Sequence, residues 1–415
     1  YGDHRDLHFS LHDALPIFNA ASKDLEVTGN NIANTGTTGF KGSRAEFAEV
    51  FNAAGPNLSS TQTGSGVRLT NVAQQFTAGS VETTNNSLDF AISGEGFFTL
   101  RDGKGYSYTR AGAFQKDQNG FVTNAEGQRL QVFPALSNGS FDNSTLSDLQ
   151  LVTSQNAAKA TSEVQMSLNL PSDALAPATP FDPVNDPSSY NQATPFTAYD
   201  SLGATHSGVV YFVKDAAANV WNANLYVDGV STGASQPITF NSSGALVSPA
   251  NGRLAFGAVS VSPGADPMQL TLDLSNATQF GNTYAASSIN QDGYPTGVLA
   301  SIDVSREGVV QAKYSNGQST ALGQLAMARF SNEQGLRQLD NTNWAASYDS
   351  GTPIMGAAGN GTYGNVQAGA LEASNTADLT AQLVNLIKAQ RNYQANAQVI
   401  STDNQLTQTI LNIRN

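Results

Sequence analysis

The stretch DLTAQLVNLIKAQRNYQANAQVISTDNQLTQTILNIRN, residues 378–415, contains neither proline nor glycine. It can therefore extend as one helix of about 55 Å, at ~1.5 Å per residue. Asn375 or Thr376 can cap the start of this helix, and Asp378 suits its first turn. Apolar residues recur along it at a spacing of roughly 3.5 residues, which predicts a coiled-coil seam. The seam consists of Leu379, Leu383, Leu386, Tyr393, Ala397, Ile400 and Leu411, interrupted by Gln390 and Asn404.

A second helical stripe lies near the beginning of the chain. Its members fall at steps of three, four or seven residues, which places them on one side of a helix. They are Ala14, Phe18, Ala21, Leu25 and Ile32. Asn30, Asn31 and Asn34, followed by Gly36 and Gly39, are residue types that end helices. The three asparagines allow two interpretations: their amides satisfy free carbonyls at the helix end, or they bond a neighbouring chain at a subunit joint.

Neither terminal helix can bury its stripe alone, because isolated amphipathic helices are marginal in water. One alternative is an antiparallel coiled coil that the two ends form within one molecule. The other, which we favour, is that the stripes meet stripes from other copies of the chain. In that case the free ends would become ordered only on assembly.

Between the two ends the sequence reads as β structure throughout. Short apolar and aromatic runs are separated, at roughly ten-residue spacing, by the turn pairs Asp102-Gly103, Asn119-Gly120 and Glu126-Gly127. A second β set follows, in which Trp221, Ala223, Leu225 and Val227 alternate with polar neighbours. Strand-like runs after residue 297 can return to the first β set. We therefore predict an α+β fold of predominantly antiparallel β domains, one inserted into another, with N- and C-terminal α-helices that pair as a coiled coil.

These patterns divide the chain into five predicted segments. Residues 1–17 differ in composition from the rest, and we interpret them as a non-native start. A terminal helical domain comprises 18–34 and 376–415, and a connecting segment comprises 35–75 and 365–375. An inner β domain comprises 76–153 and 297–364, and an outer β domain, 154–296, is inserted into it.

The composition excludes several classes of protein. The chain carries 33 acidic against 20 basic residues, a net charge of -13, which argues against a nucleic-acid surface. It has no cysteine, so disulfides, thiolate nucleophiles and iron–sulfur clusters are ruled out. No apolar run reaches the ~18 residues of a membrane-spanning helix, and no ordinary secretory signal opens the chain. We expect a protein that is cytoplasmic or leaves the cell without a cleaved signal.

The motifs that could carry chemistry are weak. His4, His8 and His12 would share one face of a helix and could hold a metal, but no carboxylate shell around them is obvious from the sequence. Residues 359–364, GNGTYG, match a dinucleotide-binding pattern, yet neither the preceding strand nor the following helix that it requires is evident. We therefore predict no catalytic, cofactor-binding or metal-binding residue and no enzyme activity.

Three blocks of sequence closely resemble the bacterial flagellar rod and hook family. The first runs from Leu25 to Lys41 and includes Asn30, Asn31, Asn34, Gly39 and Phe40. The second comprises residues 93–98 and 108–114, and the third is the ending from Leu383 to Leu411. The match begins near Phe18 or Asn19. Within the inserted domain, residues 199–204 with 209–214 are similar to the hook members of the family.

The resemblance implies a structural subunit that polymerises into a helical tube, with terminal helices lining its channel and β domains outside. Such a tube is a flexible universal joint between rod and filament. The implied partners are other copies of the chain, the flagellar rod, the hook cap, the hook–filament junction proteins and the type III export apparatus, which delivers the subunit outside the cell. No cofactor, nucleic acid or membrane insertion is implied. The alternatives are a distal rod protein and a secreted adhesin-like β protein, which would account for Trp221 and the tyrosine content but not for helices with seams at both ends.

Overall fold

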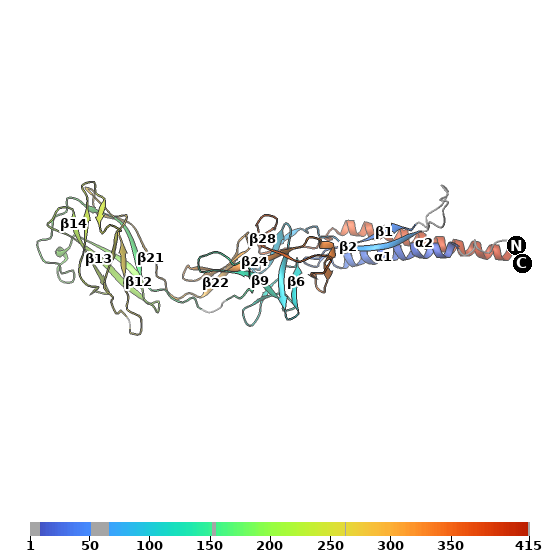
Figure 1. Ribbon diagram of the computed structural model, residues 1–415, viewed down its shortest axis with the longest axis horizontal. Coiled ribbons are helices and arrows are strands. Elements are labelled where there is room, and N and C mark those ends of the chain that lie inside the picture. Colours follow the sequence, from blue (N-terminus) through green and yellow to red (C-terminus); the bar gives the residue numbers. More distant parts are fainter. Residues whose placement is uncertain (1–8, 51–65, 152–154, 262, 414–415) are drawn as a thin grey trace. The chain divides into compact units, whose positions relative to one another are not determined.

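Helices occupy both ends of the described chain, and strands account for most of the structure between them (Figure 1). The computed structural model describes residues 9–50, 66–151, 155–261 and 263–413. The chain divides into two compact units. The helix-bearing unit comprises residues 1–152, 302–312 and 320–415, and the inserted unit comprises residues 153–301 and 313–319. The predicted class, mostly antiparallel β with helices at both ends, is confirmed.

The two helices, α1 (Phe9–Ala33) and α2 (Leu379–Ile413), lie alongside each other in antiparallel directions (Figure 1). The rings of Phe18 and Tyr393 are 4.6 Å apart between centroids, and near the other end of α1 the Thr376 hydroxyl donates to the Asn31 carbonyl at 3.1 Å. The predicted pairing is thus confirmed, and it occurs within one chain. One face of each helix is therefore shielded within the chain, and our favoured alternative, that the stripes meet stripes from other copies, stays a prediction.

The first helix is longer than predicted. It begins at Phe9 instead of residue 18, because the helical pattern already includes Ala14. A hairpin of β1 (Ser43–Glu49) and β2 (Val67–Gln74) then contacts α1 within the expected connecting segment.

The β part of the helix-bearing unit is built on a twelve-stranded sheet with the central order β22-β23-β24-β9-β5-β6-β26-β25. Its core is apolar and includes Phe90, Phe98, Leu100, Leu325 and Met327. Two small sheets connect strands from the N-terminal part of the chain with strands from its C-terminal part, because β28 pairs with β4 and β29 pairs with β3. The strands are β3 (Val81–Thr83), β4 (Phe90–Ser93), β5 (Phe97–Asp102), β6 (Gly105–Thr109), β7 (Gln115–Lys116), β8 (Val122–Thr123), β9 (Arg129–Pro134), β10 (Ser147–Asp148), β22 (Leu299–Val304), β23 (Val309–Tyr314), β24 (Ser319–Arg329), β25 (Arg337–Gln338), β26 (Asn343–Ala345), β27 (Ile354–Ala357), β28 (Asn365–Ala368) and β29 (Ala370–Glu372).

The inserted unit contains two sheets that share one core. The six-stranded sheet has the order β12-β13-β14-β16-β17, with β15 on β14. The five-stranded sheet has the order β18-β19-β11-β20, with β21 on β11. Trp221, Ala223, Leu225 and Val227 all point into the core, as their alternation predicts. The strands are β11 (Glu163–Pro171), β12 (Gln192–Tyr199), β13 (Thr205–Lys214), β14 (Val220–Val227), β15 (Val230–Ser231), β16 (Gln236–Phe240), β17 (Leu246–Ser248), β18 (Arg253–Ala255), β19 (Thr271–Asp273), β20 (Thr278–Phe280) and β21 (Ala285–Gln291).

Candidate functional site

The face of α2 that is shielded within the chain repeats at alternating steps of four and three residues. This is the spacing of a two-helix seam. The residues at this spacing that are partly or fully buried are Gln382, Leu386, Ala389, Tyr393, Asn396 and Ile400, and Ala397 beside them is half-buried. On α1, Ala20, Ala21 and Val27 are buried. Small side chains at Ala20, Ala21 and Ala389 allow the helices to approach closely.

The structure brings together only part of the predicted seam. Leu386, Tyr393, Ala397 and Ile400 are half-buried on α2, and Ala21 is buried on α1 beside the half-buried Phe18, Leu25 and Ile32. Leu379 and Leu383 stay outside the buried face, and the side chain of Leu411 lies outside the described residues. Sequence reasoning missed Gln382, Ala389 and Asn396, because polar and small residues carry little hydrophobic signal.

Leu379, Leu383 and Ile387 form a second apolar stripe on α2. Residues four apart lie on the same side of a helix. Their exposed fractions are 50%, 49% and 48%. We call these three residues the open stripe. Further along α2, Val399 and Leu406 are exposed as well.

Asn31 connects the end of α1 to the start of β1. Its Nδ2 donates to the Ser43 carbonyl at 2.8 Å, and its Oδ1 accepts from the Ser43 amide at 2.9 Å. Asn34 Nδ2 instead donates to the Asn30 carbonyl at 3.0 Å, which also accepts the Asn34 backbone amide at 3.2 Å at the helix end. Asn30 itself is exposed. Its Oδ1 accepts from Asn34 Nδ2 at 3.5 Å, so all three asparagine side chains have partners within the chain, and bonding to a neighbouring chain stays a prediction.

Gly39 and Phe40 lie where the N- and C-terminal segments meet. Gly39 has φ +67°, and a Cβ there would be 2.4 Å from the Ala111 nitrogen, so this position requires glycine. The Gly39 amide donates to the Glu372 carbonyl at 2.7 Å. Phe40 is buried, and its carbonyl accepts from the Asn375 amide at 3.2 Å. These contacts join the first sequence block to the segment before α2.

A buried ionic cluster lies beneath this joint. The Lys41 Nζ is 2.5 Å from Glu372 Oε1, and Arg110 Nη1 is 3.2 Å from Glu372 Oε2. All three side chains are almost completely shielded from solvent. Burial lowers the pKa of Lys41, although the Glu372 carboxylate opposes this shift. We call Lys41, Arg110 and Glu372 the ion cluster. Sequence reasoning missed it, although Lys41 and Arg110 both stand in quoted sequence blocks.

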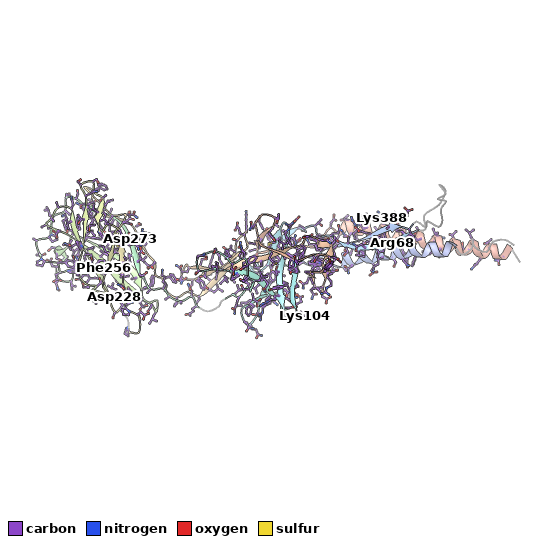
Figure 2. The ribbon with its side chains drawn as sticks, in the orientation of Figure 1. Arg68, Lys104, Asp228, Phe256, Asp273 and Lys388 are labelled. Carbon is purple, nitrogen blue, oxygen red and sulfur yellow. The ribbon has the colours of Figure 1, made fainter. Side chains whose placement is uncertain are left out.

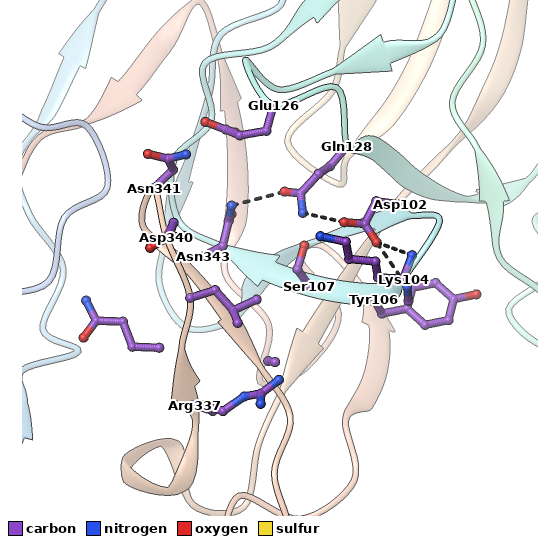
Figure 3. A pocket seen from close by; sticks show the side chains of 14 residues that line it. Asp102, Lys104, Tyr106, Ser107, Glu126, Gln128, Arg337, Asp340, Asn341 and Asn343 are labelled. Carbon is purple, nitrogen blue, oxygen red and sulfur yellow. Dashed lines mark hydrogen bonds between the residues drawn. The ribbon is translucent and has the colours of Figure 1, made fainter.

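A polar groove of about 870 Å³ lies beside β6, β25 and β26 (Figure 3). Its side chains bond one another: Asn343 Nδ2 donates to Gln128 Oε1 at 3.1 Å, and Gln128 Nε2 donates to Asp102 Oδ2 at 3.3 Å. Asp102 also accepts the Lys104 amide, which is the main reason that its pKa is lowered. The network stabilises hairpin turns and contains no nucleophile–base pair.

The structure does not support the remaining motifs, among the described residues, as binding or catalytic sites. Residues 359–364 form a turn between β27 and β28, with no helix to open a nucleotide site. Among the described residues, no group of three or more His, Asp or Glu side chains could hold a metal ion. His4, His8 and the side chain of His12 lie outside the described residues. Trp221 is fully buried, so it offers no surface for an adhesin.

No helix in the described part of the chain has the length and apolarity to cross a membrane.

Comparisons with known proteins cover nearly the whole chain. Four family models match in order: "Flagella basal body rod protein" at 18–41, "Flagellar hook protein FlgE/F/G D1 domain" at 91–176, "Flagellar basal body protein FlaE D2 domain" at 169–294, and "Flagellar basal body rod FlgEFG protein C-terminal" at 367–413. The flagellar hook protein FlgE of Salmonella typhimurium is 38% identical over 98% of this chain and 100% of its own length. The chain belongs to the flagellar hook protein family. The predicted resemblance, including its start near Phe18, is confirmed.

Other hook proteins match over similar lengths. FlgE of Escherichia coli K12 is 38% identical over 95% of this chain and 98% of its own length. FlgE of Borreliella burgdorferi is 31% identical over 94% and 96%, respectively. The crystal structure of hook protein FlgE2 from Helicobacter pylori has a TM-score of 0.51 at 13% identity, over 70% of this chain and all of that one. That likeness concerns the fold alone.

Proposed function

We propose that this member of the hook protein family is a structural subunit that polymerises into the helical tube of the flagellar hook, a flexible universal joint between rod and filament. The open stripe carries the proposal. Three aliphatic side chains about half-exposed on one side of a long helix leave apolar surface that another copy can cover. Contacts that repeat head to tail without closing produce an open filament.

The same proposal assigns a place to each predicted segment. We infer that the terminal helical domain, 18–34 and 376–415, lines the channel, with the connecting segment, 35–75 and 365–375, around it. The inner β domain, 76–153 and 297–364, and the outer β domain, 154–296, form the layers outside. The subunit would leave through the type III export apparatus and meet the rod, the hook cap and the hook–filament junction proteins. No enzymatic step is required.

Leu383→Asp tests the open stripe. Burying the remaining half of each aliphatic side chain contributes about 1 kcal/mol, and burying an unpaired carboxylate costs several kcal/mol. Every subunit of a tube repeats this cost. The variant should therefore stay soluble at concentrations where the wild type forms tubes, as measured by sedimentation and electron microscopy.

Asn392→Asp is the matched control. It adds the same charge on α2, nine residues from Leu383, which is two and a half turns and hence the opposite side of the helix. Asn392 is exposed, as Leu383 largely is. The control should form tubes normally, and both variants should unfold like the wild type. Normal tubes from Leu383→Asp would overturn the role of the open stripe, and a wild type that never polymerises would overturn the proposed function.

A further inference from the structure

His206 lies in the inserted unit, near the start of β13, between two carboxylates. Its Nδ1 is 2.6 Å from Asp228 Oδ2, and its Nε2 is 3.3 Å from Asp200 Oδ2. Asp200 belongs to the turn between β12 and β13, and Asp228 to the turn between β14 and β15. The residue is only 7% exposed. The ring therefore connects two turns at the same end of the six-stranded sheet; Asp228 is labelled in Figure 2.

Backbone amides orient both carboxylates, from within its own turn for Asp200 and from β13 for Asp228. Asp200 Oδ1 accepts the amides of Leu202 and Ala204 at 2.9 and 2.8 Å. Asp228 Oδ1 accepts the Ser207 amide at 2.9 Å. Each aspartate therefore uses one oxygen for the backbone and directs the other towards the ring. Neither can turn away without losing backbone hydrogen bonds.

This geometry fixes the protonation state of the ring. An ionised carboxylate only accepts hydrogen bonds, and a neutral imidazole has a single N–H. Two ionised carboxylate partners therefore require the imidazolium, which has two. Burial alone would lower the pKa of His206, but hydrogen bonds to Asp228 and then Asp200 raise it above its ordinary value. The hydrogen bond from His206 in turn lowers the pKa of Asp228.

We propose that His206 is a pH-sensitive clasp, which holds these two turns together when protonated and releases the Asp200 turn when it loses its proton. The groups of opposite charge that face it are Asp200 and Asp228. The hollow of about 740 Å³ beside the ring contributes no further titratable group, since its other lining residues are Pro195, Phe196, Thr197, Thr205 and Ser207.

The longer contact is the one that is lost. A neutral ring keeps its proton on Nδ1, where the hydrogen bond is shorter, and then presents the Nε2 lone pair to the Asp200 carboxylate. Two acceptors facing each other repel, so the Asp200 turn moves away. Ser201 in that turn accepts the Asp266 amide at 2.9 Å, and Leu202 at its tip is exposed. Deprotonation thus alters a surface of the inserted unit in a single chain, whether or not the chain polymerises.

The direction of the stability change follows from the raised pKa. The stabilisation by the clasp is fully present below the unfolded pKa of histidine, about 6.5. It is lost as the pH rises through the folded pKa of His206. The inserted unit should therefore become less stable from near-neutral to alkaline pH.

An NMR titration of the full-length protein tests the clasp. The four histidine ring signals are followed from pH 5 to 10, and His206→Gln identifies the signal of His206. We expect its midpoint above pH 6.5, with the Leu202 and Ala204 amide signals shifting at the same midpoint. A His206 midpoint at or below 6.5, or turn amides that do not follow it, would overturn the proposal. The wild-type titration decides this even if a variant fails to fold.

Isosteric variants distinguish the contributions of the two carboxylates to the titration midpoint of His206. Asp228→Asn should lower the His206 midpoint most, and Asp200→Asn should lower it less, in keeping with the two distances. Asp215→Asn is the matched control, because it removes the same charge just beyond the other end of β13. It should leave the midpoint unchanged. If the His206 midpoint moved equally in all three variants, the net charge of the protein, and not contact with these two carboxylates, would set it. That result would overturn the clasp.

Discussion

Replacing Glu372 by Gln should destabilise the helix-bearing unit strongly. The carboxylate accepts from Lys41 Nζ at 2.5 Å, from the Gly79 amide at 2.9 Å and from Arg110 Nη1 at 3.2 Å. Glutamine keeps the shape of the side chain but removes the only negative charge in the ion cluster. Two buried cations would then lose the one anion that both of them contact. Breaking a buried ion pair in this way costs about 3–5 kcal/mol.

The two tryptophans allow each unit to be followed separately. Trp344 is buried in the helix-bearing unit and Trp221 in the inserted unit. In a Trp221→Phe background, Trp344 fluorescence reports urea unfolding of the helix-bearing unit. With an m value of about 2 kcal/mol/M, the midpoint should fall by ~2 M. The Trp221 transition, measured in a Trp344→Phe background, should stay unchanged.

Two further variants test the electrostatic cause. Glu26→Gln removes one partner of the exposed Lys23–Glu26 pair and should cost less than about 1 kcal/mol. Lys41→Met added to Glu372→Gln removes one unpaired cation, so it should recover part of the lost stability. A Glu372→Gln midpoint within error of the wild type, or a double variant with strictly additive losses, would refute the reasoning.

Three other substitutions have effects that follow from single contacts. Gly39→Ala should destabilise the helix-bearing unit by about 2 kcal/mol or more in the Trp344 assay, because a Cβ would be 2.4 Å from the Ala111 nitrogen at a positive φ. Asn34→Ala should cost about 1 kcal/mol through the lost bond to the Asn30 carbonyl. A loss of tube formation larger than this cost explains would favour the subunit-joint interpretation, and equal losses would favour a role at the helix end alone. Lys214→Met should lower the urea midpoint of the inserted unit, followed by Trp221 fluorescence. The Lys214 Nζ donates to the carbonyls of Asp215, Ala217 and Val220 at 2.9, 2.8 and 3.1 Å, and methionine cannot. An unchanged midpoint would contradict this role.

Local sequence patterns predicted the fold well where the apolar residues of a segment repeat with a single spacing. The alternation from Trp221 to Val227 correctly predicted which side chains enter the core. On α2 the pattern was ambiguous, because apolar residues stand on two adjacent faces. Leu386 and Tyr393 turn towards α1, whereas Leu379 and Leu383 remain exposed. Ala389 is completely buried there, yet alanine is too common in helices to indicate a contact.

Long-range contacts could not be read from local patterns. Glu372 is a single acidic residue in an unremarkable segment, and its partners stand 331 and 262 positions earlier. The pairing of β29 with β3 and the bond from the Gly39 amide to the Glu372 carbonyl help to bring them together. The bonds of Asn31 to Ser43 depend in the same way on how β1 turns back along α1.

The separation between Lys41 and Glu372 has a consequence for chain synthesis. A ribosome adds Lys41 and Arg110 long before it reaches the carboxylate that neutralises them. A nascent or prematurely terminated chain therefore carries two cations that must remain hydrated, and it cannot close the joint at Gly39. Only a chain translated as far as β29 can complete this part of the molecule, so closure of the joint distinguishes chains that include Glu372 from chains truncated before it.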